Sequence, residues 1–306
     1  MPRKDRAVQI ATVTQDGIQD PSRQKVTEET LERLEAAASC RPDIICLPEC
    51  FTGPEAESVP GPMTQRLGEW ARAKSAYVVC AIRTRRDGRM YNSAVLIDRA
   101  GKVVGQYDKI NPTEGEMKDG VTPGHNTPVF TTDFGKIGFQ ICFDANWGEN
   151  WTRLKQGGAE IIFWPSAYPA HRLLAARACL NECYVASSTL SRASRIYDIT
   201  GEVMSQSGAY QPWTQATVHL GKRLFEIDYE LGTIRKIERK YGHRVLIQWY
   251  HDEDWFTLTS VDPDLATEDI IAEFAMVPLQ PYHARCERAA DAARRAAGAF
   301  RPAAGE

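Results

Sequence analysis

The stretch "GFQICFDANW", from Gly138 to Trp147, decides how the rest of the chain is interpreted. Its apolar half, together with the preceding Ile137, is typical of a strand covered on both faces and runs to Cys142. A cysteine there is either a small apolar residue that packs in the core or a nucleophile at a strand end. Taken alone the stretch favours packing, so the residues that accompany Cys142 decide between the two.

Similar apolar runs recur along the chain and predict an α/β fold, because segments with helical periodicity, such as residues 27–39 and 171–182, lie between several of them. Two segments, 91–109 and 194–208, instead have the pattern of strand, short Gly-containing turn and strand, so the sheet should be mixed. The predicted buried strands cover residues 8–13, 43–48, 77–82, 137–142, 159–165 and 183–189.

Composition and charge limit the classes of partner. The chain has 306 residues, 43% of them apolar, which is enough for a sizeable core. A net charge of −3 without any block of Lys or Arg predicts no nucleic-acid partner and no anionic membrane surface, so a small molecule is expected. No apolar stretch approaches the roughly 18 residues of a membrane helix. Eight cysteines without a secretory signal indicate reduced thiols and a cytoplasmic protein.

Two parts are predicted along the chain: a catalytic domain over residues 1–229 and a C-terminal extension over residues 230–306. The extension contains an aromatic cluster in residues 242–260 and an Ala-rich helical pattern in residues 284–300. Both would leave apolar surface exposed, so we expect the chain from about His243 onward to pack against a neighbouring subunit, with packing on its own domain as the alternative.

Three predicted strands end in residues that together suit acyl transfer: Glu49, Lys109 and Cys142. Sites in open α/β sheets form outside the carboxyl ends of strands, so these side chains can converge although they are far apart in the sequence. A free thiol with a pKa near 8.5 needs a base to accept its proton or a cation to stabilise the thiolate. Glu49 can supply the first and Lys109 the second, and a thiol activated in this way should react with iodoacetamide faster than the other cysteines.

The surroundings of these three residues resemble those of the nitrilase (carbon–nitrogen hydrolase) superfamily, whose members carry an ordered Glu, Lys and Cys. The resemblance covers approximately residues 8–229, and it implies a four-layer αββα sandwich of two mixed sheets with helices outside, assembled as a homodimer or a higher homo-oligomer. The matching segments are "PDIICLPECF", "YNSAVLID", "GKVVGQYDKINPTEGE", "FGKIGFQICFDANW", "GAEIIFWPSAYP", "ARACLNECYVASST" and "SRIYDITGEVM".

The resemblance also implies a mechanism. Cys142 would attack the carbon of a C–N bond, while Glu49 takes the thiol proton and then protonates the departing amine. Lys109 and the backbone N–H of Phe143 would stabilise the oxyanion, and Glu49 would activate the water that hydrolyses the thioester. The family's second glutamate is assigned to Glu116, with Glu114 as the competitor.

No motif implies a metal, a nucleotide or a flavin, so no cofactor is expected. The residues after Cys142 match the amidase and N-carbamoyl hydrolase branches, in which an Asp (here Asp144) stands where nitrile-hydrolysing members have Glu after Cys-Trp. Hydrolysis of a linear amide or N-carbamoyl compound, releasing ammonia or an amine, is therefore the first hypothesis. Nitrile hydrolysis by the same residues and a non-catalytic oligomeric scaffold are the alternatives.

One departure from the family pattern weakens any inference about the substrate. Gly148 precedes Glu149 where members of the family commonly have Pro before Glu, and this loop would line the pocket. The residues expected to form the pocket walls follow predicted strand ends beside Cys142, and they are Trp147, Ser166, Ala167 and Tyr168.

Overall fold

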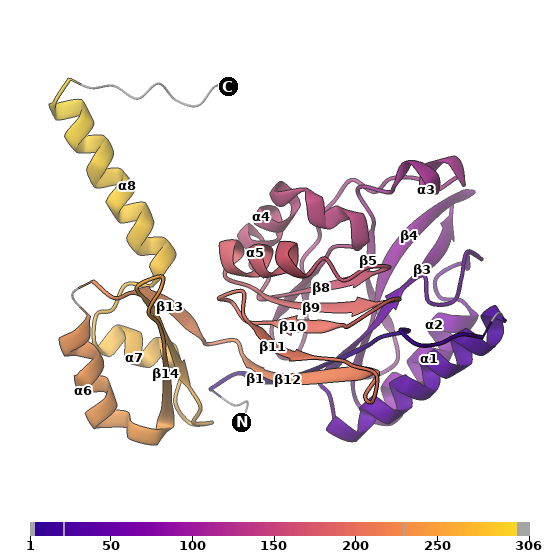
Figure 1. The fold of residues 1–306 in the computed structure, drawn as a ribbon, viewed down its shortest axis with the longest axis horizontal. Helices are drawn as coiled ribbons and strands as arrows, with labels where there is room; N and C mark the ends of the chain where they lie inside the picture. The colour runs from indigo at the N-terminus through magenta and orange to yellow at the C-terminus, as the bar shows by residue number, and fades with distance from the viewer. Residues whose placement is uncertain (1–3, 21, 229, 299–306) are drawn as a thin grey trace. The chain divides into compact units, whose positions relative to one another are not determined.

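The computed structural model describes residues 4–20, 22–228 and 230–298. These divide into two compact units, which are considered separately (Figure 1). The larger unit spans Val8–Val218, and the smaller one comprises the described residues of 1–7 and 219–306.

The larger unit is built on two six-stranded mixed sheets. In the first, of order β12-β1-β2-β3-β4-β5, strands β1 to β3 are parallel and β3 to β5 antiparallel. In the second, of order β11-β10-β9-β8-β7-β6, strands β7 to β9 are parallel and the outer pairs β6–β7, β9–β10 and β10–β11 antiparallel. The strands of the first sheet are β1 (Ala7–Val13), β2 (Ile44–Glu49), β3 (Tyr77–Arg86), β4 (Arg89–Ile97), β5 (Val103–Asp108) and β12 (Trp213–His219). Those of the second are β6 (Phe130–Thr131), β7 (Lys136–Phe139), β8 (Ile161–Ser166), β9 (Tyr184–Thr189), β10 (Arg195–Tyr197) and β11 (Val203–Gln206).

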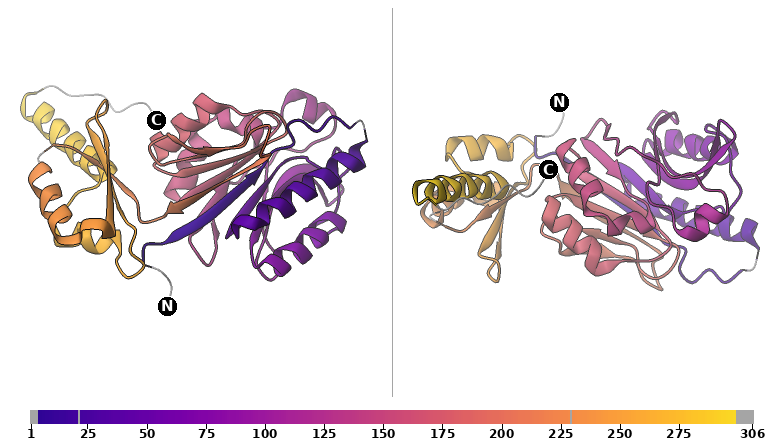
Figure 2. Two further views of the ribbon diagram at one scale, coloured as in Figure 1. Left: turned by 60° about the horizontal axis from the view of Figure 1, so that its bottom comes forward. Right: turned by 90° about the horizontal axis from the view of Figure 1, so that it is seen from above.

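Helices cover the outer face of each sheet, which gives four layers (Figure 2). On the first sheet, α1 (Arg23–Ala37), followed by the 3₁₀ turn η1 (Ala38–Cys40), and α2 (Pro62–Lys74) bury apolar side chains against the strands. On the second, α4 (Gly148–Gln156) and α5 (His171–Asn181) do the same. The predicted αββα sandwich of two mixed sheets is therefore confirmed.

Burial on both faces explains the continuous apolar runs. Strand β2 contacts β8 and β9 of the opposite sheet, and all six of its residues are buried. The sheets are also joined by a polar contact: Ser188 Oγ lies 2.6 Å from the carbonyl oxygen of Val13 and 3.1 Å from that of Cys46. Both segments predicted as strand pairs form antiparallel pairs, β4–β5 and β10–β11.

One predicted strand is shorter than expected. The run from Ile137 to Cys142 forms a strand only as far as Phe139, and Cys142 instead begins the 3₁₀ helix η2 (Cys142–Asn146). The side chain of Asp144 accepts the backbone N–H of Ile141 at 3.0 Å, so this turn replaces continued strand pairing. Cys142 therefore lies beyond the end of strand β7, in the turn that follows it.

The smaller unit has its own core. A three-stranded antiparallel sheet of order β13-β15-β14 stacks Phe225 on Phe256 with ring centroids 5.0 Å apart. The aromatic cluster predicted for residues 242–260 contributes to this core, because Phe256 is buried and Trp249 packs beside it. Its elements are β13 (Arg223–Glu226), α6 (Leu231–Tyr241), η3 (Gly242–Arg244), β14 (Val245–Tyr250), β15 (Trp255–Ser260), α7 (Thr267–Glu273) and α8 (Leu279–Ala296).

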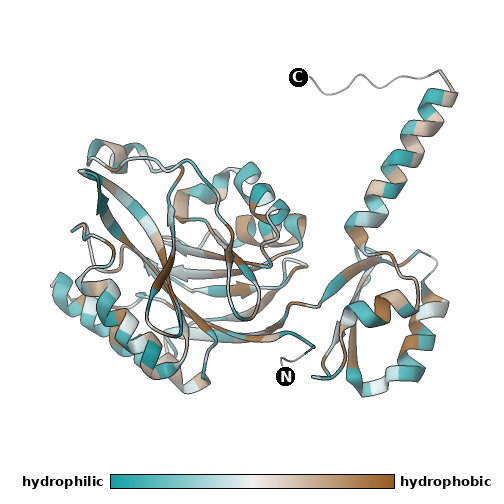
Figure 3. Ribbon diagram, turned by 180° about the vertical axis from the view of Figure 1, so that it is seen from behind, coloured by the Kyte–Doolittle hydropathy of each residue, from teal (hydrophilic) through white to brown (hydrophobic). Residues whose placement is uncertain are grey.

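Helix α8 is the least buried long element of this unit. Leu279 is its only buried residue within the described chain. Hydrophilic and apolar residues alternate along its surface (Figure 3). Among the described residues, no helix of either unit has the length and apolar character needed to cross a membrane.

Candidate active site

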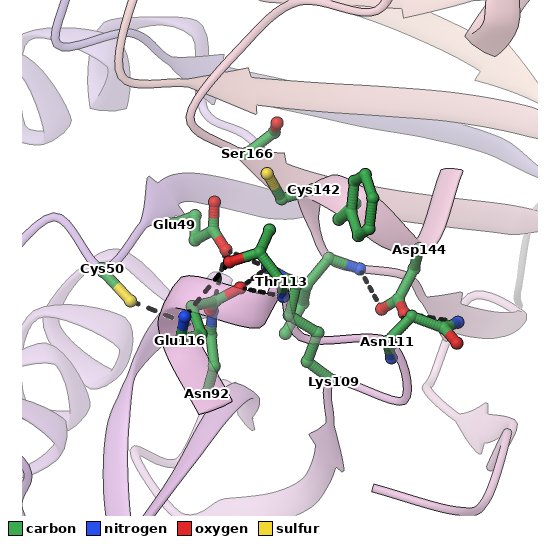
Figure 4. A network of polar contacts seen from close by, with 12 residues as sticks. Glu49, Cys50, Asn92, Lys109, Asn111, Thr113, Glu116, Cys142, Asp144 and Ser166 are labelled. Carbon is green, nitrogen blue, oxygen red and sulfur yellow. Dashed lines mark hydrogen bonds and ion pairs between the residues drawn. The ribbon is translucent and has the colours of Figure 1, made fainter. Parts of the chain in front are cut away.

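Glu49, Lys109 and Cys142 lie together at the carboxyl ends of strands from both sheets (Figure 4). Glu49 is the last residue of β2, Lys109 follows β5, and Cys142 begins η2 three residues after the end of β7. All three are buried. The convergence predicted from the strand ends is therefore present in the fold, and α3 (Glu114–Lys118) closes the same region.

Lys109 joins two carboxylates. Its Nζ lies 2.8 Å from Oε1 of Glu49 and 2.8 Å from Oε2 of Glu116. Burial alone would lower the pKa of Lys109, but the charges of Glu49, Cys142 and Glu116 raise this pKa above its ordinary value. The ammonium group consequently keeps its charge well above neutral pH.

Glu116, and not Glu114, is the second carboxylate of this cluster. Glu116 sits in the first turn of α3, where its Oε2 accepts the backbone N–H of Thr113 at 2.9 Å and the Thr113 hydroxyl accepts the Glu116 N–H at 3.2 Å. This capping box fixes its side chain toward Lys109. Although burial favours the neutral acid, Lys109 and the hydrogen bonds of Thr113 and Asn92 lower the pKa of Glu116. Glu114 is exposed on the same helix.

Two further residues of the cluster were not predicted in the sequence analysis. Asn92 on β4 donates its side-chain nitrogen to Glu49 Oε1 at 2.7 Å and to Glu116 Oε1 at 2.8 Å. Arg83 on β3 lies opposite Asn92 in the strand pairing, and its Nη2 is 3.4 Å from Glu116 Oε1. The sequence did offer one signal for Asn92, because it is a polar residue within the largely apolar segment "YNSAVLI", where it is fully buried.

The backbone at Cys142 is held in an unusual conformation. Its φ is +48°, in the left-handed region that costs about 1–3 kcal/mol for a residue with a β-carbon. The indole Nε1 of Trp164 donates to the Cys142 carbonyl oxygen at 3.0 Å and stabilises this turn. Within the described residues the backbone N–H of Phe143 makes no hydrogen bond. It is thus available as a donor next to the sulfur.

The surroundings of Cys142 raise the pKa of its thiol and so favour the protonated form at neutral pH. Burial and then the negative charge of Glu49 raise the pKa of Cys142 to about 12, against the opposing effects of Lys109, the Ala167 backbone N–H and the Ser166 hydroxyl. The sulfur therefore needs a base when it reacts. Within the described residues Glu49 uses only Oε1 in hydrogen bonds, which leaves Oε2 uncommitted.

Asp144 anchors the loop that carries Cys142. It is fully buried and accepts hydrogen bonds from the hydroxyl of Tyr107 at 2.7 Å and from the backbone N–H groups of Ile141 at 3.0 Å and Asn111 at 2.8 Å. Tyr107 belongs to β5 and Asn111 follows Lys109, so Asp144 ties the cysteine turn to the segment that carries the lysine. Burial raises the pKa of Asp144 despite these bonds.

Arg177 on α5 holds the other end of the same turn. Its Nε donates to the carbonyl oxygen of Ala145 at 3.1 Å and its Nη2 to that of Asn146 at 3.2 Å. These carbonyls end the 3₁₀ helix and would otherwise lack partners. Arg177 occupies space beside Gly148, the position at which the chain departs from the family pattern.

The residues predicted as pocket walls differ in their burial and in their distance from the Cys142 sulfur. Ser166 is buried at the end of β8, and the Ser166 hydroxyl and Ala167 backbone N–H lie close enough to the sulfur to lower the Cys142 pKa. Tyr168 is half-buried, and its own pKa is raised first by burial and then by Cys142. Trp147 is exposed and meets Phe143 edge to face, with ring centroids 5.2 Å apart.

The described residues contain no cluster of three or more His, Cys, Asp or Glu side chains suited to a metal ion.

Comparison with known proteins identifies the family of the chain. A family model described as carbon-nitrogen hydrolase matches residues 6–222. The omega-amidase NIT2 of Homo sapiens is 27% identical over 237 residues, which cover 66% of this chain and 86% of that protein.

Solved structures share the fold at lower identity. The Saccharomyces cerevisiae protein Nit3, described as a member of branch 10 of the nitrilase superfamily, superposes with a TM-score of 0.62 at 20% identity, covering 78% of this chain and 95% of that one. A variant of the amidase from Nesterenkonia sp. AN1 superposes with a TM-score of 0.61 at 17% identity, covering 76% and 96%. In that variant the acetamide moiety of fluoroacetamide is covalently added at the active-site cysteine.

Proposed function

Because the chain belongs to the carbon–nitrogen hydrolase family, we propose that it hydrolyses a linear amide or N-carbamoyl compound through a thioester on Cys142. One observation carries this proposal. Lys109 and Asn92 hold one oxygen of Glu49, while the other oxygen stays uncommitted beside a buried, protonated thiol. A base, a cation and a nucleophile are thus arranged as acyl transfer requires.

In the first step the S–C bond forms as the thiol proton passes to Glu49. A Cys142 pKa of about 12 means that very little thiolate exists at neutral pH, so proton transfer must accompany the attack. The π electrons of the carbonyl move to its oxygen. Lys109 Nζ and the unbonded N–H of Phe143 supply two donors for that oxyanion, and such donors contribute about 3–4 kcal/mol each in well-formed sites.

In the second step the oxyanion collapses and the C–N bond breaks. Glu49, now protonated, returns its proton to the leaving nitrogen, and ammonia or an amine departs. The thioester is then attacked by water, which gives its proton to Glu49. The C–S bond breaks, Cys142 recovers a proton, and the carboxylic or carbamic acid is released. Glu116 takes no proton in this scheme, because Lys109, Asn92 and Thr113 already occupy both of its oxygens.

The choice of amide over nitrile rests on the Cys-Phe-Asp sequence and on the names of the relatives, an omega-amidase and an amidase. The burial of Asp144 gives this signature a physical role: it shapes the cysteine turn from within. We assign the walls of the pocket to Phe143, Trp147, Ser166, Ala167 and Tyr168.

The decisive experiment measures ammonia release from a panel of primary amides, N-carbamoyl amino acids, N-carbamoyl amines and nitriles. We expect turnover of at least one amide or carbamoyl compound and its loss in Cys142→Ala. Turnover of nitriles alone would contradict the proposed branch. Failure of the folded wild type to turn over any class would favour the alternative of a non-catalytic scaffold.

The proposal extends to assembly and location. We propose a cytoplasmic homodimer or higher homo-oligomer whose catalytic domain lies within residues 1–229, with the extension over residues 230–306 in contact with its own domain or a neighbouring subunit. The exposed surface of α8 supports a role in subunit contact, since only its first residue is buried within the described chain. A small-molecule substrate, with neither nucleic acid nor membrane, remains the expected partner.

A further inference from the structure

Arg83 is a cation of the site that the proposed mechanism does not use. It lies on β3 directly opposite Asn92 of β4, so both side chains reach the same carboxylate, Glu116, from neighbouring strands. The Nη2 atom is 3.4 Å from Glu116 Oε1, and only 13% of the Arg83 side chain is exposed. A charged side chain is seldom buried to this extent unless a partner compensates its desolvation.

The contacts of Arg83 favour a role for its positive charge over a role in bidentate hydrogen bonding. Nη1 of Arg83 is buried and makes no hydrogen bond within the described residues. An arginine that binds a carboxylate tightly usually donates two parallel hydrogen bonds to it. Because Nη1 has almost no accessible surface, a substrate anion also cannot reach it without rearrangement.

The charge balance of the cluster shows what Arg83 supplies. Glu49 and Glu116 share the ammonium group of Lys109 and the amide of Asn92. Two carboxylates against one ammonium group leave a net charge of −1, and Arg83 brings the sum to zero. Carboxylates that share a site without enough positive charge take up a proton, because like charges disfavour ionisation of both groups.

We propose that Arg83 is a positioning residue that keeps the Glu49–Glu116 pair ionised on the acid side of neutral pH, so that Glu49 can accept the Cys142 proton there. This rests on the proposed function, in which Glu49 is the base. Without the charge of Arg83, the pair takes up a proton from solvent at a higher pH than in the wild type. A Glu49 that already holds a proton cannot take another from the thiol, and activity falls on the acid side of the pH profile.

Among the described residues, several charged and titratable groups surround the pair. Those groups come from both sheets and from the loops that follow their strands. They are Cys50 after β2, Arg83 on β3, Lys109 after β5, Asp144 and Cys142 on η2, and Tyr168 after β8. Of these, Lys109 and Arg83 are the cations, so Arg83 is the side chain whose loss leaves the pair under-compensated while the lysine stays in place.

The test compares Arg83→Gln with the wild type in the pH dependence of kcat/KM for an amide that the wild type hydrolyses. Removing a positive charge next to a carboxylate raises the pKa of that carboxylate by about one unit, so the acid limb should move up by about one pH unit. Near pH 8 the kcat/KM values of Arg83→Gln and the wild type should be similar. Arg83→Lys keeps the charge and should return the limb to within a few tenths of a unit of the wild type.

Two controls separate charge from structure. Arg85→Gln removes an exposed charge two residues further along β3 and should leave the limb unchanged. The double variant Arg83→Gln/Glu116→Gln restores the charge balance, so whatever its overall rate, its limb should lie below that of Arg83→Gln. Arg83→Met offers a second neutral variant in case the first does not fold.

A folded, active neutral variant with the wild-type acid limb overturns the inference, as does a loss of rate that is uniform across pH. If the proposed amidase function is itself wrong, the result is different, because the wild type then releases no ammonia from any amide. In that event the rate of Cys142 alkylation by iodoacetamide, followed against pH in the wild type and in Arg83→Gln, provides the readout. An identical pH dependence in the two proteins contradicts the inference.

Discussion

Arg177 fills the space beside Gly148: a β-carbon added at Gly148 would lie 2.6 Å from Arg177 Nη1. The guanidinium group cannot move away freely, because it donates to the carbonyl oxygens of Ala145 and Asn146. The glycine that interrupts the family pattern therefore makes room for the side chain that holds the end of the cysteine turn.

Gly148→Ala should accordingly lower kcat more than it lowers stability. The added methyl group displaces Arg177 and loosens the turn that aims the Phe143 N–H, and we expect a loss of about tenfold in kcat. The free energy of unfolding should change by less than about 1 kcal/mol, because alanine restricts the unfolded chain more than glycine does and so partly offsets the weakened hydrogen bonds of Arg177. Steady-state kinetics and thermal unfolding measure the two effects.

Gly232→Ala is the matched control for this substitution. Gly232 lies in helix α6, and a β-carbon there meets nothing within 4 Å. We expect a slightly higher melting temperature and an unchanged kcat. If Gly148→Ala behaves in the same way, the steric account of Gly148 is wrong.

Substitution of the two glutamates of α3 separates Glu116 from Glu114. Glu116→Gln removes the charge that holds Lys109 Nζ at 2.8 Å, and we expect kcat to fall about a hundredfold, by analogy with the loss of one oxyanion donor. Glu114→Gln changes the same residue type on an exposed position of the same helix and should leave kcat within about twofold. Equal losses in both variants would argue against the assignment.

The lowered pKa of Glu116 also predicts how the free energy of unfolding depends on pH. The pKa of Glu116 in the folded protein is lowered, so its contribution is complete above the unfolded value of about 4.3 and is lost as pH falls through the folded value. Unfolding followed by denaturant between pH 7 and 3 should show a shallower acid loss for Glu116→Gln than for the wild type. Parallel curves would exclude a stabilising role for this carboxylate.

Cys142 should react slowly with iodoacetamide in the free protein. The sequence alone suggested an activated thiolate that reacts faster than the other cysteines, but burial and Glu49 raise the pKa of Cys142 to about 12. A higher pKa means a smaller thiolate fraction at every pH below it, so the exposed Cys286 should be alkylated first at pH 7. Mass spectrometry of peptides after timed alkylation measures both rates, and faster modification of Cys142 would show that its thiolate is already formed.

The proposed role of α8 in assembly is tested by removing residues 279–306. We expect the full chain to sediment as a dimer or larger species and the truncated chain to sediment as a smaller one. Circular dichroism checks that the truncated chain is folded. A full chain that sediments as a monomer, or equal association states before and after truncation, would contradict the proposal.

Several parts of the site could be predicted because their signals are local. Glu49, Lys109 and Cys142 stand where an apolar run gives way to a polar residue, and parallel strands of a sheet end at the same edge. Cys142 was nevertheless placed in a strand, since the pattern of its neighbours does not reveal that the Asp144 side chain bonds the Ile141 N–H and turns the chain.

The sequence by itself predicted an α/β fold with a mixed sheet and three candidate residues at strand ends, because burial periodicity and residue chemistry are local properties of the chain. The two-sheet sandwich was implied by the resemblance of its motifs to the nitrilase superfamily. Only the tertiary structure decided that Asn92 and Arg83 meet at Glu116 and that Arg177 occupies the space beside Gly148. The physical reason is that strand register and sheet packing bring these atoms together from distant segments. The raised pKa of Cys142 has the same origin, since it depends on the burial and charges that surround the thiol in the folded chain.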